Sequence, residues 1–320
     1  MSRLNRRELI KIAGAAAGFY VIGGRRVASA EAKQATGPEK PADRYAAHIE
    51  SLKGKVAVAR NDDPYRNTLK AIALLGGMKA FVKPGAAVVV KPNIGWNRPP
   101  SACATTNPDV VRAIVEECVK AGAGKVEVYD RTCEDRRRCY ARSGIEAAAK
   151  AAGATVRFIE DYEYADTEIP RGKILKKWPV IEGILKADVV INAPIAKDHD
   201  TATLTLAMKN LMGVMGGQRG DIHTNLGQKL ADFNTRIQPA LNIIDANSIL
   251  VAHGPQGGTA EDIRTPRTVI AGVEAATVDA FAAANLPWTI AAGRKVEGLD
   301  AAGELGLGVV DAAKIKVIEG

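Results

Sequence analysis

Lysine and asparagine side chains follow the apolar runs at 86–90 and 189–193, where an anionic ligand could be bound. If these runs are buried strands, an ammonium at their ends needs water, a counter-charge or a ligand, because an unpaired buried charge is strongly penalised. Lysines offer charge-assisted hydrogen bonds to a carboxylate or phosphate, and asparagines add neutral ones. The candidate ligand-binding residues of this kind are Lys91, Asn93, Lys197, Lys209 and Asn210.

Two aspartates bear on the role of these lysines. Asp245 ends the apolar run at 241–245, and Asp198 directly follows Lys197. We include Asp245 in the ligand site, where it would fix a lysine or a histidine. In the alternative account, Lys91 and Lys197 form salt bridges with Asp198 and Asp245 and bind no ligand.

Three of the four histidines lie in the second half of the chain. His199 or His223 is a candidate general base, because the ordinary pKa of imidazole is close to neutrality, and Lys197 completes the candidate catalytic set. With Asp198, the same two histidines offer nitrogen and oxygen ligands suited to Zn or Fe. No fixed ligand spacing is present, so hydrogen-bonded surface histidines are the alternative.

Two glycine-rich segments stand beside these residues, at 213–220 and 253–259. The first could wrap backbone amides around an anion, or it could be a plain flexible loop or lid. It does not match the dinucleotide-binding fingerprint, which opens a helix directly after a strand. The second segment would form another wall of the site.

The four cysteines divide into one core residue and three candidates for a disulfide. Cys118 lies on the apolar face of a predicted helix at 108–121. An exported protein meets an oxidising compartment, which favours a disulfide among the others, although spacing does not fix the pair. No ferredoxin-type cluster motif is present. The disulfide candidates are Cys103, Cys133 and Cys139.

Strand and helix patterns alternate along the chain, which predicts an α/β fold with a mostly parallel sheet and helices on both faces. A small antiparallel addition is expected around 162–184, and 46–320 is expected to be one domain. The predicted strands are 55–60, 86–90, 125–130, 155–159, 189–193, 241–245 and 268–272, and the predicted helices are 108–121, 145–152, 202–212, 228–236 and 275–286.

Residues 1–30 have the three regions of a twin-arginine (Tat) export signal. Arg6 and Arg7 precede an uncharged run of glycine, alanine and apolar residues, and Ala28-Ser29-Ala30 is a small-x-small cleavage site. We expect cleavage after Ala30, passage through the Tat translocon, a periplasmic location and a flexible tether at 31–45. The uncharged run is too short to span a bilayer as a helix, so no stable membrane insertion of the mature chain is expected.

The formal charge of +8 depends largely on this leader. Six basic residues and one acidic residue in 1–30 account for +5 of it, which leaves +3 for the rest of the chain. The densest basic run, at 136–138, follows two acidic residues and lacks interleaved aromatic side chains. Single-strand binders use such aromatic platforms, so the sequence argues against a nucleic-acid partner.

Five short motifs lie between residues 56 and 286. They are Val-Val-Val-Lys-Pro-Asn at 88–93, Thr-Thr-Asn-Pro at 105–108, Ile-Ala-Lys-Asp-His at 195–199, Met-Lys-Asn-Leu-Met-Gly at 208–213 and Ile-Ile-Asp at 243–245. Together they resemble the domain-of-unknown-function family 362, over roughly residues 56–286. The family usually has threonine where this chain has Asp198. Many members carry ferredoxin-like iron–sulfur motifs, which this chain lacks, so the resemblance supports the position of the site and leaves its chemistry open.

The sequence therefore predicts an exported periplasmic protein that binds an anionic small molecule or a metal cofactor through lysine, asparagine and histidine. A redox-associated enzyme is the first form of this hypothesis. A non-catalytic solute- or metal-binding protein, or a subunit of an exported complex, is the alternative.

Overall fold

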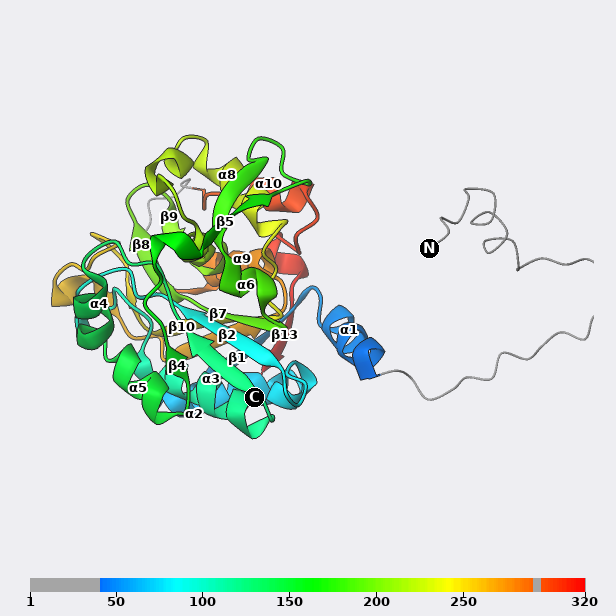
Figure 1. The fold of residues 1–320 in the computed structure, drawn as a ribbon. Coiled ribbons are helices and arrows are strands. Elements are labelled where there is room, and N and C mark those ends of the chain that lie inside the picture. The colour runs from blue at the N-terminus through cyan, green and yellow to red at the C-terminus, as the bar shows by residue number, and fades with distance from the viewer. Residues whose placement is uncertain (1–40, 290–294, 320) are drawn as a thin grey trace, which may run out of the picture. The chain divides into compact units, whose positions relative to one another are not determined.

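Strands of a mostly parallel sheet form the centre of the structure (Figure 1). The computed structural model describes residues 41–289 and 295–319. The strands are β1 (Lys55–Arg60), β2 (Ala87–Pro92), β3 (Lys125–Val128), β4 (Thr155–Val156), β5 (Tyr164–Glu168), β6 (Lys177–Ile181), β7 (Val189–Ala193), β8 (Ile195–His199), β9 (Thr203–Thr205), β10 (Leu241–Leu250), β11 (Ile263–Arg264), β12 (Thr268–Gly272) and β13 (Lys316–Glu319).

Within the described ranges, eleven strands make one sheet and β5 pairs with β6 separately. β4, β3, β2, β7 and β10 lie side by side and run parallel. β12 is antiparallel to both β10 and β1, and β13 pairs in parallel with β1. β8 continues beside β10, and β9 folds back on β8. The predicted α/β fold with a mostly parallel sheet is confirmed.

Helices cover the sheet on both faces (Figure 1). Short 3₁₀ turns add to them, among which η4 (Leu211–Val214) and η5 (Arg219–His223) border the candidate site. The helices are α1 (Pro41–Ser51), α2 (Pro64–Leu74), α3 (Pro108–Lys120), α4 (Arg136–Arg142), α5 (Ile145–Ala151), α6 (Glu182–Lys186), α7 (Ala207–Asn210), α8 (Leu226–Asn234), α9 (Ala275–Asn285) and α10 (Leu299–Glu304).

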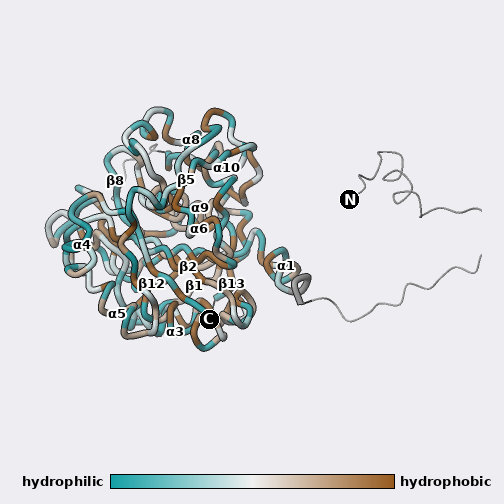
Figure 2. The backbone as a smooth tube through the Cα atoms, viewed as in Figure 1, coloured by the Kyte–Doolittle hydropathy of each residue, from teal (hydrophilic) through white to brown (hydrophobic). Residues whose placement is uncertain are grey.

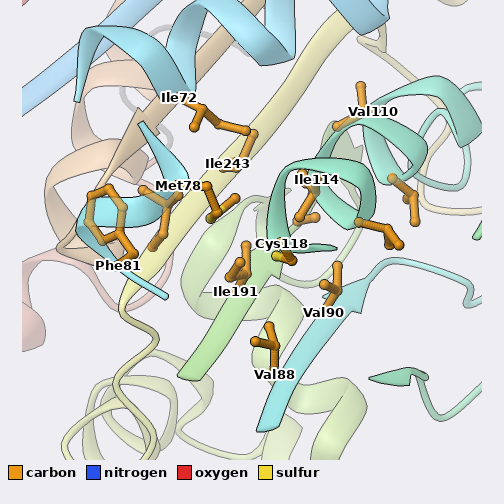
Figure 3. Packing of buried hydrophobic residues seen from close by; sticks show 14 of the residues in the cluster. Ile72, Met78, Phe81, Val88, Val90, Val110, Ile114, Cys118, Ile191 and Ile243 are labelled. Carbon is orange, nitrogen blue, oxygen red and sulfur yellow. The ribbon is translucent and has the colours of Figure 1, made fainter. Parts of the chain in front are cut away.

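Alternating side chains of β2 divide the core between the two faces. Val88 and Val90 pack with Ile114 and Cys118 of α3 in one buried cluster (Figure 3). Val89 points the other way and belongs to a second cluster that includes residues of α6 and α8. Successive side chains of a strand point to opposite faces, so a continuous run of valine fits a strand with helices on both sides. Hydrophobic residues accordingly concentrate along the central strands, and the surrounding loops are mainly polar (Figure 2).

Helix α3 begins where Asn107 caps it. The Asn107 side chain accepts a hydrogen bond from the Asp109 N–H (2.8 Å), and Pro108 occupies the first helical position, where no donor is lost. The apolar face predicted for this helix is fully buried. The predicted antiparallel addition is also present, because β5 and β6 pair antiparallel from Tyr164 and Ile181 onward.

The structure corrects the prediction of one helix over 202–212. Thr203 and Thr205 instead form β9, which pairs with His199 and Lys197 of β8, so 195–199 is a strand rather than a loop. Helix α7 starts only at Ala207, where the Asp279 side chain accepts hydrogen bonds from the first N–H groups. The β-branched threonines favour the strand, and a buried aspartate far along the chain sets where the helix begins.

Two boundaries also change. The strand predicted over 241–245 extends to Leu250 as β10, and residues 41–45 belong to α1 rather than to a tether. The predicted export signal at 1–30 and the rest of the tether at 31–40 lie outside the described residues. In the described part of the chain, no helix is long and apolar enough to cross a membrane.

Candidate functional site

A small pocket lies beyond the carboxyl ends of β2 and β3, beside β8 and α7, where ligands commonly bind in parallel α/β sheets. Its volume is about 80 Å³, below the roughly 300 Å³ at which sites for drug-sized ligands begin. Five lysine and arginine side chains and one carboxylate line it, which favours the binding of an anion. The lining residues that could take part in binding or chemistry are Lys91, Asn93, Asp130, Arg131, Cys133, Lys197, His199, Lys209, Asn210 and Arg219.

The floor of the pocket is a buried ion pair. The Lys91 ammonium lies 2.8 Å from Asp130 Oδ1, and both side chains are nearly fully buried. Lys91 also donates to the Pro92 carbonyl (2.7 Å) and to Asn210 Oδ1 (3.0 Å). Burial lowers the pKa of Lys91, and Asp130 opposes that shift. Because its ammonium already has a protein counter-charge and two protein hydrogen-bond acceptors, Lys91 holds the floor together rather than binding a ligand directly.

A chain of buried asparagines supports this floor. Asn210 Oδ1 also accepts from Asn93 (3.0 Å), and its amide donates to Asn192 Oδ1 (2.8 Å) on β7. Asn192 in turn donates to Asn242 Oδ1 (3.0 Å) on β10. Each amide orients the next, so Asn210 is a structural hub whose oxygen is already occupied by Lys91 and Asn93.

Lys197 of β8 reaches the pocket with part of its hydrogen-bonding capacity used. Its ammonium donates to Asn93 Oδ1 (3.3 Å) and to the Ala104 carbonyl, and the residue is 1% exposed. Burial lowers the pKa of Lys197 to about 7. Both protonation states are therefore populated near neutral pH, and the third ammonium hydrogen has no acceptor among the described residues.

Lys209 of α7 has no hydrogen bond or ion pair among the described residues, although it is largely buried in the pocket wall. Burial lowers the pKa of Lys209 to about 8. At neutral pH the group is thus mostly a cation, and no carboxylate of the described residues forms an ion pair with it. Such an ammonium needs water or an anion.

The imidazole of His199 lies between competing groups. Backbone N–H groups of Thr201 and Ala202 point at its Nδ1 (both 3.3 Å), which places the proton of the neutral ring on Nε2. The Asp200 carboxylate, 2.9 Å from Nδ1, favours the opposite tautomer. We favour the first, because the amides are fixed donors whereas Asp200 is exposed and screened by water. Burial, reinforced by Lys209, lowers the pKa of His199 to about 3, so the ring is neutral.

Two arginines close the rim. Arg131 donates to the carbonyls of Met215 (2.9 Å) and Gly217 (3.1 Å), and Arg219 donates to the carbonyls of Arg131 and Thr132 (both 3.1 Å). The glycine-rich segment 213–220 is therefore fastened over the loop after β3 by reciprocal contacts. Gly213 and Arg219 of this segment line the pocket, and Arg219 brings a further cation to the rim.

The motif at 105–108 ties the ends of β2 and β7 together. Asn93 N–H donates to Thr106 Oγ1 (2.8 Å), and the same hydroxyl donates to the Ala193 carbonyl (2.7 Å). These two hydrogen bonds fix the backbone at Asn93, which lines the pocket.

The family described as a domain of unknown function, DUF362, matches residues 88–284. This chain belongs to the DUF362 family. A thylakoid-associated protein of Synechocystis sp. is 33% identical to it over 219 residues, which cover 65% of this chain and 64% of that protein. The chain thus spans slightly less than two thirds of the length of this relative.

Two solved structures are distantly similar to this DUF362 protein. The lactate racemase apoprotein from Thermoanaerobacterium thermosaccharolyticum has a TM-score of 0.45 and 10% identity, covering 70% of this chain and 55% of that one. A protein from Thermotoga maritima has a TM-score of 0.39 and 9% identity, covering 62% and 54% respectively. Likenesses of this degree carry no functional conclusion.

Asp245 does not belong to the pocket of this DUF362 protein. Its Oδ2 accepts from the Asn107 N–H (2.8 Å) at the start of α3, and its Oδ1 accepts from the Asn247 side chain (2.7 Å). The prediction that Asp245 fixes a lysine or histidine is therefore wrong. The alternative salt bridges are wrong as well, because Lys91 pairs with Asp130.

Asp198 and His223 also lie outside the pocket lining. Asp198 Oδ2 accepts from the Gly254 N–H (2.9 Å), which holds the segment 253–259 beside the site and brings Pro255 into its wall. His223 is exposed, and its ring contacts the Gly220 carbonyl (3.2 Å). The described residues include no group of three or more His, Cys, Asp or Glu suited to a metal ion. The metal set of His199, His223 and Asp198 is thus not assembled.

No disulfide links the cysteines. Cys103, Cys118 and Cys139 are buried and free, and Cys133 is free and exposed. The predicted disulfide among Cys103, Cys133 and Cys139 is therefore absent from this structure. Cys133 instead lines the pocket, next to Arg219.

The site contains residues that the sequence alone did not single out. Asp130 stands two residues beyond β3, where an aspartate following a parallel strand is a usable signal. Arg219 lies within the glycine-rich segment 213–220, where a single arginine is a usable signal for a cation at the site. Asn192 supports the floor of the site from inside an apolar strand. Its signal in the sequence is a polar residue in a run of Val and Ile, because such a residue must find a hydrogen-bond partner.

A larger cavity of about 480 Å³ lies at the opposite end of the sheet, beside Val189 and Ala240. Of its basic residues, Lys53 pairs with Glu50 (2.7 Å), Arg171 donates to the Leu305 carbonyl (2.5 Å), and Arg236 is exposed. It therefore lacks the unpaired buried cation that distinguishes the smaller pocket, which we take as the functional site.

Proposed function

We propose that the pocket binds the anionic group of a small molecule, with Lys209, Lys197 and Arg219 as its cationic ligands. One observation carries this proposal: the Lys209 ammonium is largely buried and has no partner among the described residues. Lys91, by contrast, has its own carboxylate in Asp130. The excess of positive charge therefore sits at the open part of the pocket, and an anion would balance it.

The size of the pocket limits what enters it. A volume of about 80 Å³ accommodates a carboxylate, sulfate or phosphate with few further atoms. The rest of a larger ligand would lie outside, against the rim formed by Arg131 and Arg219. The His199 Nε2–H would donate a neutral hydrogen bond to the anion.

We propose acid–base catalysis by Lys197 as the enzymatic form of this function. A proton-transfer group works best when its pKa is near the working pH, and the pKa of Lys197 is about 7. The pKa of His199, at about 3, keeps that ring neutral and suits it to hydrogen bonding. A non-catalytic binding protein is the second form, and it predicts that the bound molecule is recovered unchanged.

Calorimetric titration with inorganic phosphate, sulfate and acetate tests the binding proposal. Lys209→Met should weaken the affinity for the best of these anions by about tenfold or more, because it removes an ammonium from a partly desolvated contact. Lys186→Met is the matched control, since Lys186 is a surface residue with a 73% exposed side chain. Equal affinities for Lys209→Met and Lys186→Met would overturn the proposal.

We also propose that residues 1–30 direct export through the Tat translocon to the periplasm. The support is the order of Arg6-Arg7, the uncharged run and Ala28-Ser29-Ala30. Replacing Arg6 and Arg7 with lysine should retain the protein in the cytoplasm, as judged by fractionation. The same change at Arg25 and Arg26 is the control and should leave export intact.

A further inference from the structure

Cys133 places a thiol at the mouth of the cationic pocket. The residue is exposed and lines the pocket, and its Sγ lies 3.6 Å from Arg219 Nη2. Its N–H donates to the Gly95 carbonyl (2.8 Å), which anchors the backbone at this point. The thiol is therefore held at a defined position of the rim.

The other three cysteines are poorly placed to react. Burial raises the pKa of Cys103 to about 12 and that of Cys139 to about 11, and it raises the pKa of Cys118 as well. All three are at most 3% exposed. A thiol-reactive molecule in solution thus meets Cys133 first.

Cys133 also stands next to the cations that would hold an anion. Cys133 lines the same pocket as Lys209 and Lys197, and Arg219 donates to its Sγ (3.6 Å). Lys209 has no partner, and Lys197, at 1% exposed, has an ammonium hydrogen left over. An anion bound to these groups therefore lies beside the sulfur, and such proximity accelerates a reaction between them.

We propose that Cys133 is a covalent attachment site for small anionic disulfides and related sulfenyl donors. This inference rests on the proposed anion site, because the lysines and Arg219 select the charge of the reagent. The Cys133 thiol gives its proton to solvent, and the thiolate attacks one sulfur of the donor. A new bond forms between the two sulfurs as the donor's own bond breaks, and the other half leaves with the electron pair. The donor is reduced, Cys133 is oxidised, and no further oxidant is needed.

Two methanethiosulfonates of opposite charge test this in the full chain. Sulfonatoethyl methanethiosulfonate is anionic and trimethylammonioethyl methanethiosulfonate is cationic, and both form a mixed disulfide while releasing methanesulfinate. Their rates are measured by mass spectrometry at low ionic strength and divided by their rates with mercaptoethanol. The anionic reagent should react faster by about tenfold or more, within the range of electrostatic steering.

Variants assign the preference to residues. Cys133→Ser should abolish the mass increase, and Cys103→Ser should leave it unchanged. Lys209→Met should reduce the preference for the anionic reagent severalfold, whereas Lys186→Met should not. Inorganic phosphate should slow the anionic reagent and spare the cationic one.

Each negative result has its own meaning. Equal normalised rates, modification of Cys133→Ser, or a preference unchanged in Lys209→Met would each overturn the attachment site. If calorimetry still detects Lys209-dependent binding of phosphate, sulfate or acetate, the anion site stands and only the thiol proposal fails. If no such binding is detected and the charge preference is absent, both fail.

Discussion

The Lys91 ammonium lies 2.8 Å from the Asp130 carboxylate at the floor of the pocket, and the two side chains are only 1% and 3% exposed. Asp130 Oδ2 also accepts from the Ile94 N–H (2.7 Å), so the pair joins the loop after β2 to the loop after β3. A buried pair of this kind fixes geometry even where it adds little net stability. Lys209 lines the same pocket but has no ion pair among the described residues, whereas Lys91 has its counter-charge in Asp130.

Asp130→Asn should destabilise the protein by about 3–5 kcal/mol, because it leaves the buried Lys91 ammonium without its counter-charge. Urea unfolding measures the change. Asp300→Asn is the control, since its pair with Lys295 is exposed (75% and 82% of the side chains) and should contribute at most about 1 kcal/mol. Similar losses in both variants would contradict a special role for the buried pair.

Gly213→Ala should destabilise the protein by about 1–3 kcal/mol through overpacking. A Cβ at this position would come within 2.6 Å of Lys91 Nζ and still closer to Asp130 Oδ1, so the ion pair would have to move. Gly220→Ala, in the same segment, would meet nothing within 4 Å and should have little effect. Thermal unfolding of the two variants compares them, and a stable Gly213→Ala protein would show that the floor can rearrange.

The edge of the sheet at which the site lies is predictable from the sequence. Lys91, Asn93 and Lys197 were predicted to meet, and they do, because alternating strands and helices place the carboxyl ends of parallel strands at one edge. The direction of each side chain at that edge was not predictable. Asp245 accepts a hydrogen bond from the backbone of Asn107, the residue that caps α3, whereas Asp130 pairs with Lys91. Only tertiary packing decides which of the two aspartates lies beside a lysine.

The errors in secondary structure have a similar origin. Residues 202–212 have a helical pattern, yet Thr203 and Thr205 pair with β8, and Asp279, more than seventy residues away, starts α7 at Ala207. Local sequence carries no record of such a distant partner. The predicted export signal and the predicted role of Lys197 in catalysis remain predictions.

Anion binding should weaken as the pH rises through about 7 to 8. Burial lowers the pKa of Lys197 to about 7 and that of Lys209 to about 8, so both ammonium groups lose their protons in this window. A bound anion favours the protonated forms of both lysines, and the affinity for the anion is therefore highest below about pH 7. Sulfate is the suitable probe, because it does not titrate here; calorimetry at about pH 6 and about pH 9 should show a difference of about tenfold or more. A pH-independent affinity would exclude these lysines as ligands.

Asp279 should make the protein less stable as the pH rises from about 4 to about 7. Burial raises the pKa of Asp279 to about 7 in the folded state, against an ordinary value of 3.8, although it accepts from the N–H groups of Ala207 (2.6 Å) and Met208 (2.9 Å). Between these values the folded state binds a proton that the unfolded state has released, so its contribution to stability is complete below about pH 4 and lost above about pH 7. Asp279→Asn mimics the protonated acid and should lack this dependence. Urea unfolding measures the free energy of unfolding of both proteins between about pH 4 and about pH 7. The difference between the two values should shift steadily in favour of the variant as the pH rises. Parallel pH dependences would mean that Asp279 is ionised throughout and that α7 begins at a buried carboxylate.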